Sequence, residues 1–301
     1  IGDFGVGIKK GDRGKKCQYA TSLGLAQAFK QFDLRFVITA GDNIYHEGLR
    51  SGDVDDHWFF TYFQPYRYLL NRIPVYPCIG NHDTAETKFE SSDDRKEIYD
   101  NMYVRPRFEQ SENSVDPGLF YTFRFGPSIE FLCVDTSKNT WPFGKRMFQL
   151  EQHSKFLEQH FAHQPKSRWR IVFDHHPPFS AGPEHYKWGN SIQNELVPLW
   201  EKSGISVVFS GHEHNFQYAE KDGVHYFLTG GGGKYKTSPP RKIEKVGTRS
   251  WGGNHCCHFL VVRLHQNKME VWPVSGVNEQ GELRYLALNG ELRELPIVVT
   301  L

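Results

Sequence analysis

The sequence predicts an α/β protein: two mixed β-sheets packed as a sandwich and flanked by helices. Apolar runs of strand length alternate with helix-like stretches through most of the 301 residues, which is the pattern of α/β folds. The last third instead holds short strand-like segments separated by turns, which favours antiparallel strands that complete a second sheet. No internal repeat divides the chain. We therefore expect residues 1–301 to form a single domain.

Six apolar runs are predicted to be strands of the first part of the fold. They cover residues 34–40, 73–79, 129–134, 169–173, 205–210 and 224–229. Helices are expected at residues 17–31, 57–71, 146–162 and 191–203. The candidate strands of the last third are "HFLVVRL", "MEVWPV" and "ELRYLAL".

One basic segment rich in Pro and Gly separates these two parts. It covers residues 234–254 and is expected to form a long loop. This loop is either a solvated surface excursion or a rim that faces a phosphate group.

Composition excludes several classes of protein. A hydrophobic content of 38% and an aromatic content of 15% suffice for a sizeable core. The net charge is +1 and no apolar run is long enough to span a bilayer, so we expect neither a nucleic-acid binder nor a membrane span. Oligomeric state stays open.

The five cysteines are too few and too scattered to predict a disulfide framework or a Cys-type zinc site. Cys78 and Cys133 lie inside apolar runs and are expected to be buried thiols. Whether Cys256 and Cys257 are free stays open.

Potential metal ligands follow five of the strand-like runs. Ligands of α/β sheets gather at the carboxyl ends of strands, so these side chains are expected to meet. The five segments are "GDFG" with Asp3, "GDNIY" with Asp42 and Tyr45, "GNHD" with Asn81, His82 and Asp83, "VFDHH" with His175 and His176, and "SGHEH" with His212 and His214. Each segment alone is better explained as an ordinary turn or loop. Together they offer oxygen and imidazole donors without thiolate, which favours oxygen-loving or borderline metals.

The number of candidate ligands predicts two ions. The seven are Asp3, Asp42, Tyr45, Asn81, His175, His212 and His214. One catalytic ion that keeps a place for water cannot use all seven, whereas two ions that share a bridging carboxylate can. Such a pair activates a hydroxide and neutralises both ends of an in-line displacement at phosphorus.

The ordered motifs DxG, GDxxY, GNH, VxxH and GHxH resemble those of the calcineurin-like metallophosphoesterase superfamily, and specifically the purple acid phosphatases. In this chain they are "DFG" (3–5), "GDNIY" (41–45), "GNH" (80–82), "VFDH" (172–175) and "GHEH" (211–214). The broader superfamily usually has a histidine where this chain has Gly5, and Tyr45 offers a phenol instead. A phenolate is a hard anionic donor suited to Fe(III). The resemblance implies a tyrosinate charge-transfer colour.

The resemblance also implies the role of each ligand. Fe(III) is held by Asp3, Tyr45 and His214, Asp42 bridges, and a second divalent ion (Fe, Zn or Mn) is held by Asn81, His175 and His212. The sequence does not choose among these metals. The implied activity is that of an acid phosphatase, in which a metal-bound hydroxide hydrolyses a small phosphate monoester.

Two further histidines are predicted to be catalytic. His82 follows a ligand directly, so it is expected to bind phosphate together with Asn81 and to act as an acid, with Asp83 orienting it. The second active-site histidine of the family falls on Glu184, and a one-residue insertion would place His185 there as a catalytic and substrate-binding residue.

Other features near the motifs carry weaker expectations. His176 is either a neighbour of the metal ligands or a packed side chain. The run "TGGGGKY" (229–235) is expected to bring the backbone close to the metals. Because the chain begins inside a motif, at "IGDFG", we expect the natural chain to start earlier. The resemblance favours a secreted, periplasmic or lysosome-like compartment.

Two other functions stay open. The first is a phosphodiesterase or nucleotide pyrophosphatase on the same scaffold, because the motifs specify the metals and not the leaving group. The second is a non-catalytic phosphatase-like binding module, which the complete set of ligands disfavours.

Overall fold

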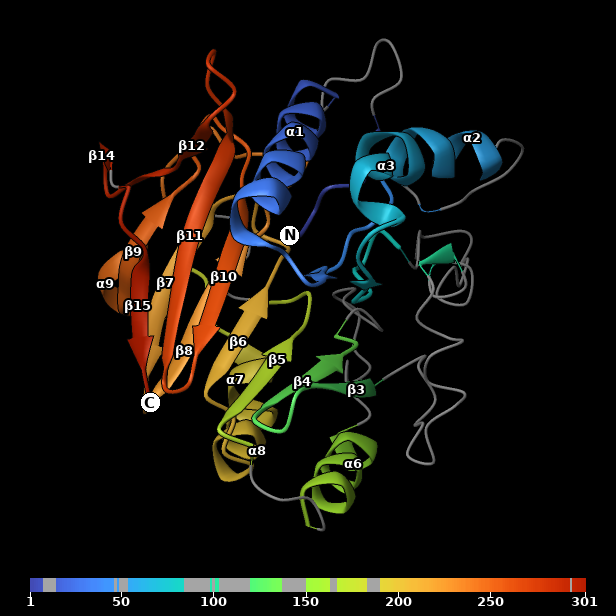
Figure 1. The fold of residues 1–301 in the computed structure, drawn as a ribbon. Coiled ribbons are helices and arrows are strands. Elements are labelled where there is room, and N and C mark those ends of the chain that lie inside the picture. Colours follow the sequence, from blue (N-terminus) through green and yellow to red (C-terminus); the bar gives the residue numbers. More distant parts are fainter. Residues whose placement is uncertain are drawn as a thin grey trace, which may run out of the picture.

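Two β-sheets pack face to face in the computed structural model, and helices cover their outer sides (Figure 1). The structure describes residues 1–7, 15–45, 48, 54–83, 98, 101–102, 120–136, 150–162, 167–182, 190–292 and 294–301. A small third sheet pairs β1 (Val37–Ile38) with β2 (Val75–Tyr76) in parallel. The predicted α/β sandwich flanked by helices is confirmed.

The larger sheet has nine strands in the order β14-β13-β9-β7-β8-β6-β5-β4-β3. Its parallel strands are β4 (Ile129–Val134), β5 (Trp169–Phe173), β6 (Val207–Ser210) and β8 (Val224–Thr229). The antiparallel additions are β3 (Phe120–Phe125), β7 (Phe216–Lys221), β9 (Thr248–Gly252), β13 (Ala287–Leu288) and β14 (Glu291–Leu292). The parallel strands bring their carboxyl ends to one edge, where α/β sheets bind ligands.

The smaller sheet is built around β11 (Lys268–Val277) and is wholly antiparallel. Its other strands are β10 (Phe259–His265), β12 (Leu283–Tyr285) and β15 (Ile297–Thr300). Helix α1 (Lys15–Phe32) lies over β11 on the outer side of this sheet (Figure 1). The second sheet predicted for the last third of the chain is therefore present.

The central strands contribute side chains to two separate hydrophobic cores. Phe131, Ile171 and Phe209 face the space between the sheets. Their neighbours in sequence face the other core, which contains side chains of α6 (Leu150–Ala162), α7 (Asn190–Glu195) and α8 (Val197–Lys202). Successive side chains of a strand point to opposite faces, so a strand that is buried on both faces has to be apolar throughout.

The predicted helices are present with changed boundaries. α1 covers the expected 17–31 segment. The expected 57–71 helix consists of α2 (Val54–Trp58), a π-helical turn (Phe59–Phe63) and α3 (Gln64–Leu70). The 191–203 segment divides into α7 and α8, because Pro198 occupies the first turn of α8. The 146–162 helix begins at Leu150 in the structure, and residues 146–149 lie outside the described residues.

The prediction of an uninterrupted loop over 234–254 is wrong. This segment contains α9 (Ile243–Val246) and β9, which extends the larger sheet beside β7. The strand "TRSWG" lacks an apolar run, so its pairing could not be predicted from composition. Strands β3, β7, β14 and β15 were also missed, and β1 and β2 are shorter than the predicted strands. The predicted strand "ELRYLAL" divides into β12 and β13.

A disulfide joins Cys17 of α1 to Cys257, with the two Cα atoms 5.4 Å apart. The sequence did not predict this bond, because cysteines 240 positions apart give no local pairing signal. Cys78 and Cys133 are buried thiols, as predicted, and Cys256 is free. Among the helices that the structure describes, none is long and apolar enough to cross a membrane.

Loss of the Cys17–Cys257 bond should lower the free energy of unfolding, because the bond restricts the unfolded chain. For the double variant Cys17→Ser/Cys257→Ser we expect a loss of about 2 to 4 kcal/mol, measured by urea unfolding. Cys256→Ser removes the adjacent free thiol and should change stability by less than about 0.5 kcal/mol. Equal stability of the double variant and the wild type would contradict a stabilising role.

Candidate metal centre

Loops after several strands bring the predicted ligands to one edge of the fold. The loops after β1, β2, β5 and β6 supply Asp42 and Tyr45, Asn81, His175, and His212 and His214 respectively. Asp3 joins them because residues 1–3 run beside β1: Ile1 N donates to the Ile38 carbonyl (3.1 Å), and Ala40 N donates to the Ile1 carbonyl (2.8 Å).

The first group of donors surrounds the Tyr45 hydroxyl. This oxygen lies 2.9 Å from Asp3 Oδ1 and 2.6 Å from Asp42 Oδ2. His214 Nε2 lies 3.3 Å from the same hydroxyl and 3.3 Å from Asp3 Oδ1. Two carboxylates, a phenol and an imidazole therefore converge on one point.

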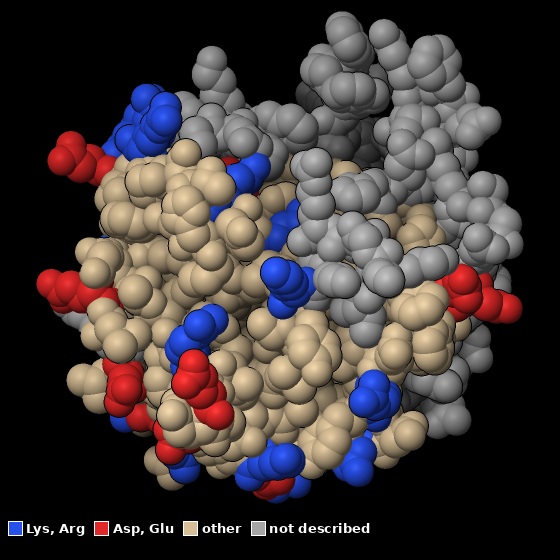
Figure 2. Space-filling view, turned by 90° about the horizontal axis from the view of Figure 1, so that it is seen from above, with Lys and Arg blue, Asp and Glu red and all other residues tan. Residues whose placement is uncertain are grey.

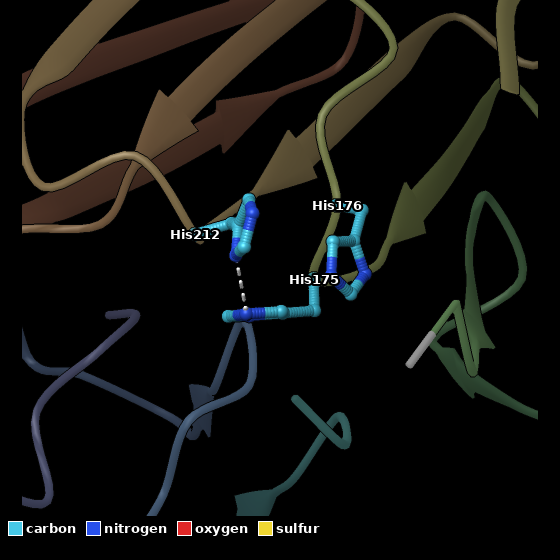
Figure 3. Close-up of side chains that lie close together, drawn as sticks. All are labelled: His175, His176 and His212. Atoms are coloured by element: carbon cyan, nitrogen blue, oxygen red, sulfur yellow. Dashed lines mark hydrogen bonds between the residues drawn. The ribbon is translucent and has the colours of Figure 1, made fainter. Parts of the chain in front are cut away.

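The second group surrounds His175 Nε2. This nitrogen lies 3.0 Å from Asn81 Oδ1, 3.4 Å from Asp42 Oδ1 and 3.3 Å from His212 Nδ1. Figure 3 shows this contact between the His175 and His212 rings, which meet edge to face, with His176 beside them. The other ring nitrogen, His175 Nδ1, lies 2.7 Å from the Ala40 carbonyl. This contact favours the Nδ1–H tautomer, which leaves the Nε2 lone pair for a ligand.

Asp42 belongs to both groups. Its Oδ2 faces Tyr45 while its Oδ1 faces His175 and accepts a hydrogen bond from His82 N (2.9 Å). Tyr45 thus contacts one carboxylate oxygen of Asp42 and His175 lies near the other, and each is surrounded by its own group of candidate donors. This arrangement is compatible with the bridging carboxylate that the resemblance implies.

The backbone at three of these positions is left-handed. Asp3, Asp42 and His212 have φ values of 56°, 51° and 69°, a conformation that costs non-glycine residues about 1 kcal/mol each. The chain holds it with hydrogen bonds: His212 N donates to Asp3 Oδ2 (2.8 Å), and Asp3 N donates to the Gly41 carbonyl (3.0 Å). Strain of this kind gathers at functional sites.

A glycine precedes a ligand in three of the motifs, for a tertiary reason. A Cβ atom at each would collide with another candidate ligand: His175 at Gly41, Asp42 at Gly80 and Asp3 at Gly211. The glycines therefore allow the loops to approach one another.

Burial and neighbouring charges together shift the pKa values of the two carboxylates when no cation is bound. Asp3 and Asp42 are 0% and 1% exposed. Burial raises the pKa of Asp3 to about 7, although the charge of His175 opposes this. Burial also disfavours ionisation of Asp42, but the charges of His175 and His82 outweigh it and hold its pKa below the usual range.

The remaining donors of the first group fit a cation as well. Burial and the neighbouring carboxylates raise the pKa of the Tyr45 phenol well above its ordinary value. Burial lowers the pKa of His214 to about 3, so its imidazole is neutral, which is the form that binds metals. A cation in place of the shared protons would stabilise the carboxylates and the phenolate.

Asp83 connects two of the ligand loops. It is buried and accepts hydrogen bonds from the backbone N–H groups of Asn43 (2.8 Å), Ile44 (2.9 Å) and Gly80 (2.8 Å). These bonds join the Asp42 loop to the Asn81 loop. The sequence suggested that Asp83 orients His82, which stays a prediction, and the hydrogen bonds of Asp83 hold the two loops together.

His82 and His176 lie on different sides of the ligands. The His82 ring packs against the Tyr45 ring with centroids 4.4 Å apart and is partly exposed. His176 is buried, with its Nδ1 3.1 Å from Thr136 Oγ1 and its ring 4.4 Å from that of His212. It forms with His175 and His212 a group of ring nitrogens close enough to hold an ion. His185 lies outside the described residues.

The glycine run approaches the centre, as expected. Gly232 N donates to the Gly2 carbonyl (2.9 Å), and Gly233 N donates to the Asp3 carbonyl (2.8 Å). The next residue, Lys234, lies with Nζ 3.4 Å from the centroid of the Tyr45 ring. Lys234 belongs both to the basic segment and to the run "TGGGGKY", but the sequence predicted no role for it. Its place directly after four glycines was the signal that could have singled it out.

The calcineurin-like phosphoesterase family model matches residues 1–216. The chain belongs to this family of metal-dependent phosphoesterases, which are hydrolases. Among its relatives, "Purple acid phosphatase 7" of Arabidopsis thaliana is 27% identical over 232 residues, or 74% of this chain and 68% of that protein. The predicted resemblance is confirmed.

Solved structures agree on the fold. The purple acid phosphatase PPD1 of yellow lupin has a TM-score of 0.64 and 16% identity, covering 100% of this chain and 52% of that one. GAP50, the anchor in the inner membrane complex of Plasmodium, has a TM-score of 0.65 and 17% identity, covering 99% of this chain and 87% of that one.

The raised pKa of Asp3 predicts a pH-dependent stability of the metal-free protein. Its pKa rises from 3.8 to about 7 on folding, so its contribution is full below the unfolded pKa and is lost as the pH rises through the folded pKa. We therefore expect the wild type to lose stability relative to Asp3→Asn as the pH rises from roughly 4 to 7. The free energy of unfolding of both proteins is measured with a chelator present. Asp55→Asn, at an exposed position, should show no such trend.

Proposed function

We propose that the protein is a binuclear metal-dependent acid phosphatase that hydrolyses phosphate monoesters. The observation that carries this proposal is Asp42, whose two carboxylate oxygens face two separate groups of donors. The similarity to purple acid phosphatases supports the same function.

The donor set suits two different ions. Fe(III) would lie among Asp3, Asp42, Tyr45 and His214, because two carboxylates and a phenol supply hard anionic donors. A second divalent ion (Fe, Zn or Mn) would lie among Asp42, Asn81, His175 and His212. When bound, the two cations would withdraw charge from the phosphoryl oxygens and lower the pKa of an attacking water.

The chain itself supplies binding and proton transfer. His82 is partly exposed, and its backbone N–H is anchored to Asp42, so its ring is held at the edge of the centre. From there it would donate a hydrogen bond to a phosphoryl oxygen or a proton to the leaving group. Asn81 and His185 are the other proposed substrate-binding residues, with His185 as a second catalytic histidine.

A non-catalytic binding module is the second candidate, since the anchor protein GAP50 has the same fold. All seven proposed ligand residues are present in this chain, which supports catalysis instead. A phosphodiesterase or nucleotide pyrophosphatase would use the same metals.

We also propose that residues 1–301 form one domain. We further propose that the protein resides in an oxidising environment, either secreted, periplasmic or in a lysosome-like compartment. One buried apolar cluster extends from Phe4 to Val299, which supports a single domain. The Cys17–Cys257 disulfide supports the compartment, because such bonds persist in oxidising surroundings. The proposed partner is a small phosphate ester, with no nucleic acid.

Removal of the bridging carboxylate should abolish hydrolysis of p-nitrophenyl phosphate. We expect Asp42→Ala and His212→Ala to lower kcat by about a thousand-fold or more, because each loses several kcal/mol of charge stabilisation. Asp55→Ala is the exposed control and should retain activity, and circular dichroism should show the same fold in all variants. An active Asp42→Ala protein would refute the site.

The ester class is tested in the same assay by comparing bis(p-nitrophenyl) phosphate with the monoester. We expect a higher kcat/KM for the monoester. A clear preference for the bis-ester would replace the proposed activity with that of a phosphodiesterase.

The phenol ligand predicts colour. The iron-loaded protein should absorb visible light, and Tyr45→Phe should lose this band, whereas Tyr235→Phe, at an exposed position, should keep it. Stoichiometric metal without visible absorption, even after mild oxidation, would exclude an Fe(III) tyrosinate and leave the hydrolase proposal standing.

A further inference from the structure

Lys234 places an ammonium group at the wall of the candidate metal centre. Its Nζ lies 3.4 Å from the centroid of the Tyr45 ring, whose hydroxyl contacts both Asp3 and Asp42. This distance is within the range of a cation–π interaction. The proposed phosphatase chemistry assigns no role to this lysine.

The fold fixes the backbone on both sides of Lys234. Before it, Gly233 N donates to the Asp3 carbonyl (2.8 Å). After it, Lys236 N donates to the His214 carbonyl (2.8 Å). Because both anchors are residues of the candidate centre, the position of Lys234 is tied to the same loops as the ligands.

The described part of the chain offers Lys234 no ion-pair partner. Among the described residues, no carboxylate lies within salt-bridge distance of its Nζ. The side chain is only partly exposed, and burial lowers the pKa of Lys234 while the charges of Asp42 and Asp3 act against this. Its long-range attraction is therefore directed toward the centre, where an anion would enter.

Figure 2 views the molecule from above, with Lys and Arg side chains across the middle of the described surface and most Asp and Glu side chains toward its margins. Positive charge on a surface favours the approach of anions.

We propose that Lys234 is a substrate-binding residue whose ammonium contacts a phosphoryl oxygen of the ester. The proposal rests on the phosphatase function above. His82 lies against the same Tyr45 ring, with centroids 4.4 Å apart, so both side chains contact one candidate ligand. A lysine acts as a point charge, and Coulomb attraction grows with the charge of its partner. Lys234 therefore favours dianionic phosphate monoesters over monoanionic diesters.

The test compares Lys234→Met, which keeps the length of the side chain, with Lys234→Arg, which keeps the charge. Lys242→Met removes the same charge from an exposed position of the same segment and is the matched control. For each metal-loaded protein, inorganic phosphate binding is measured by calorimetry, KM and kcat are measured with monoester and bis-ester, and metal content is measured by elemental analysis.

We expect Lys234→Met to raise the Kd of phosphate and the KM of the monoester by about tenfold, the usual effect of one charge-assisted contact. Lys234→Arg should stay within about threefold and Lys242→Met within about twofold of the wild type. The bis-ester KM should change less than the monoester KM, and metal content should not change.

The proposal is overturned if Lys234→Met binds phosphate within about twofold of the wild type, or if it loses metal, which would show that Lys234 supports Tyr45 instead. Failure of the proposed function gives a different result. A wild type that binds phosphate through Lys234 but hydrolyses no ester would support this inference and refute the phosphatase. If the wild type binds no phosphate, Lys234 is not a substrate-binding residue.

Discussion

The arrangement of the site depends on the contacts that the two carboxylate oxygens of Asp42 make. One of its oxygens lies 2.6 Å from the Tyr45 hydroxyl and the other lies 3.4 Å from His175 Nε2. Asp42 is therefore in contact with both donor groups. The Asp83 carboxylate holds the loops of Asp42 and Asn81 together, and Gly80 lets them touch. The position of the site thus follows from loop packing at the ends of β1 and β2.

The layers of the fold position the edge of the sheet at which the candidate ligands lie. Strands β4, β5 and β6 run parallel and are covered on both faces, which leaves their carboxyl ends as the place where polar side chains can gather. The smaller sheet and α1 close the other side of the core, and the Cys17–Cys257 disulfide joins α1 to the chain just before β10. Distant parts of the sequence therefore support one cluster of donors.

Much of this could be predicted from the sequence, because buried parallel strands and their polar ends leave local signals. Runs such as "IEFLCV" and "WRIVF" coincide with β4 and β5, and the motifs predicted which side chains converge. Strand β9 and the disulfide could not be predicted, since both depend on partners far away in the chain. The contacts of Asp83 and Lys234 are also tertiary, and single-sequence spacing does not record them.

The left-handed backbone at Asp3, Asp42 and His212 has a consequence for exchange of the ions. Hydrogen bonds within the chain hold these residues, including the bond from His212 N to Asp3 Oδ2. Folding thus already orders the donors, so binding of an ion would need little further loss of conformational entropy. At the proposed centre, the strand-end loops would therefore keep their shape when one ion leaves and another of similar size replaces it.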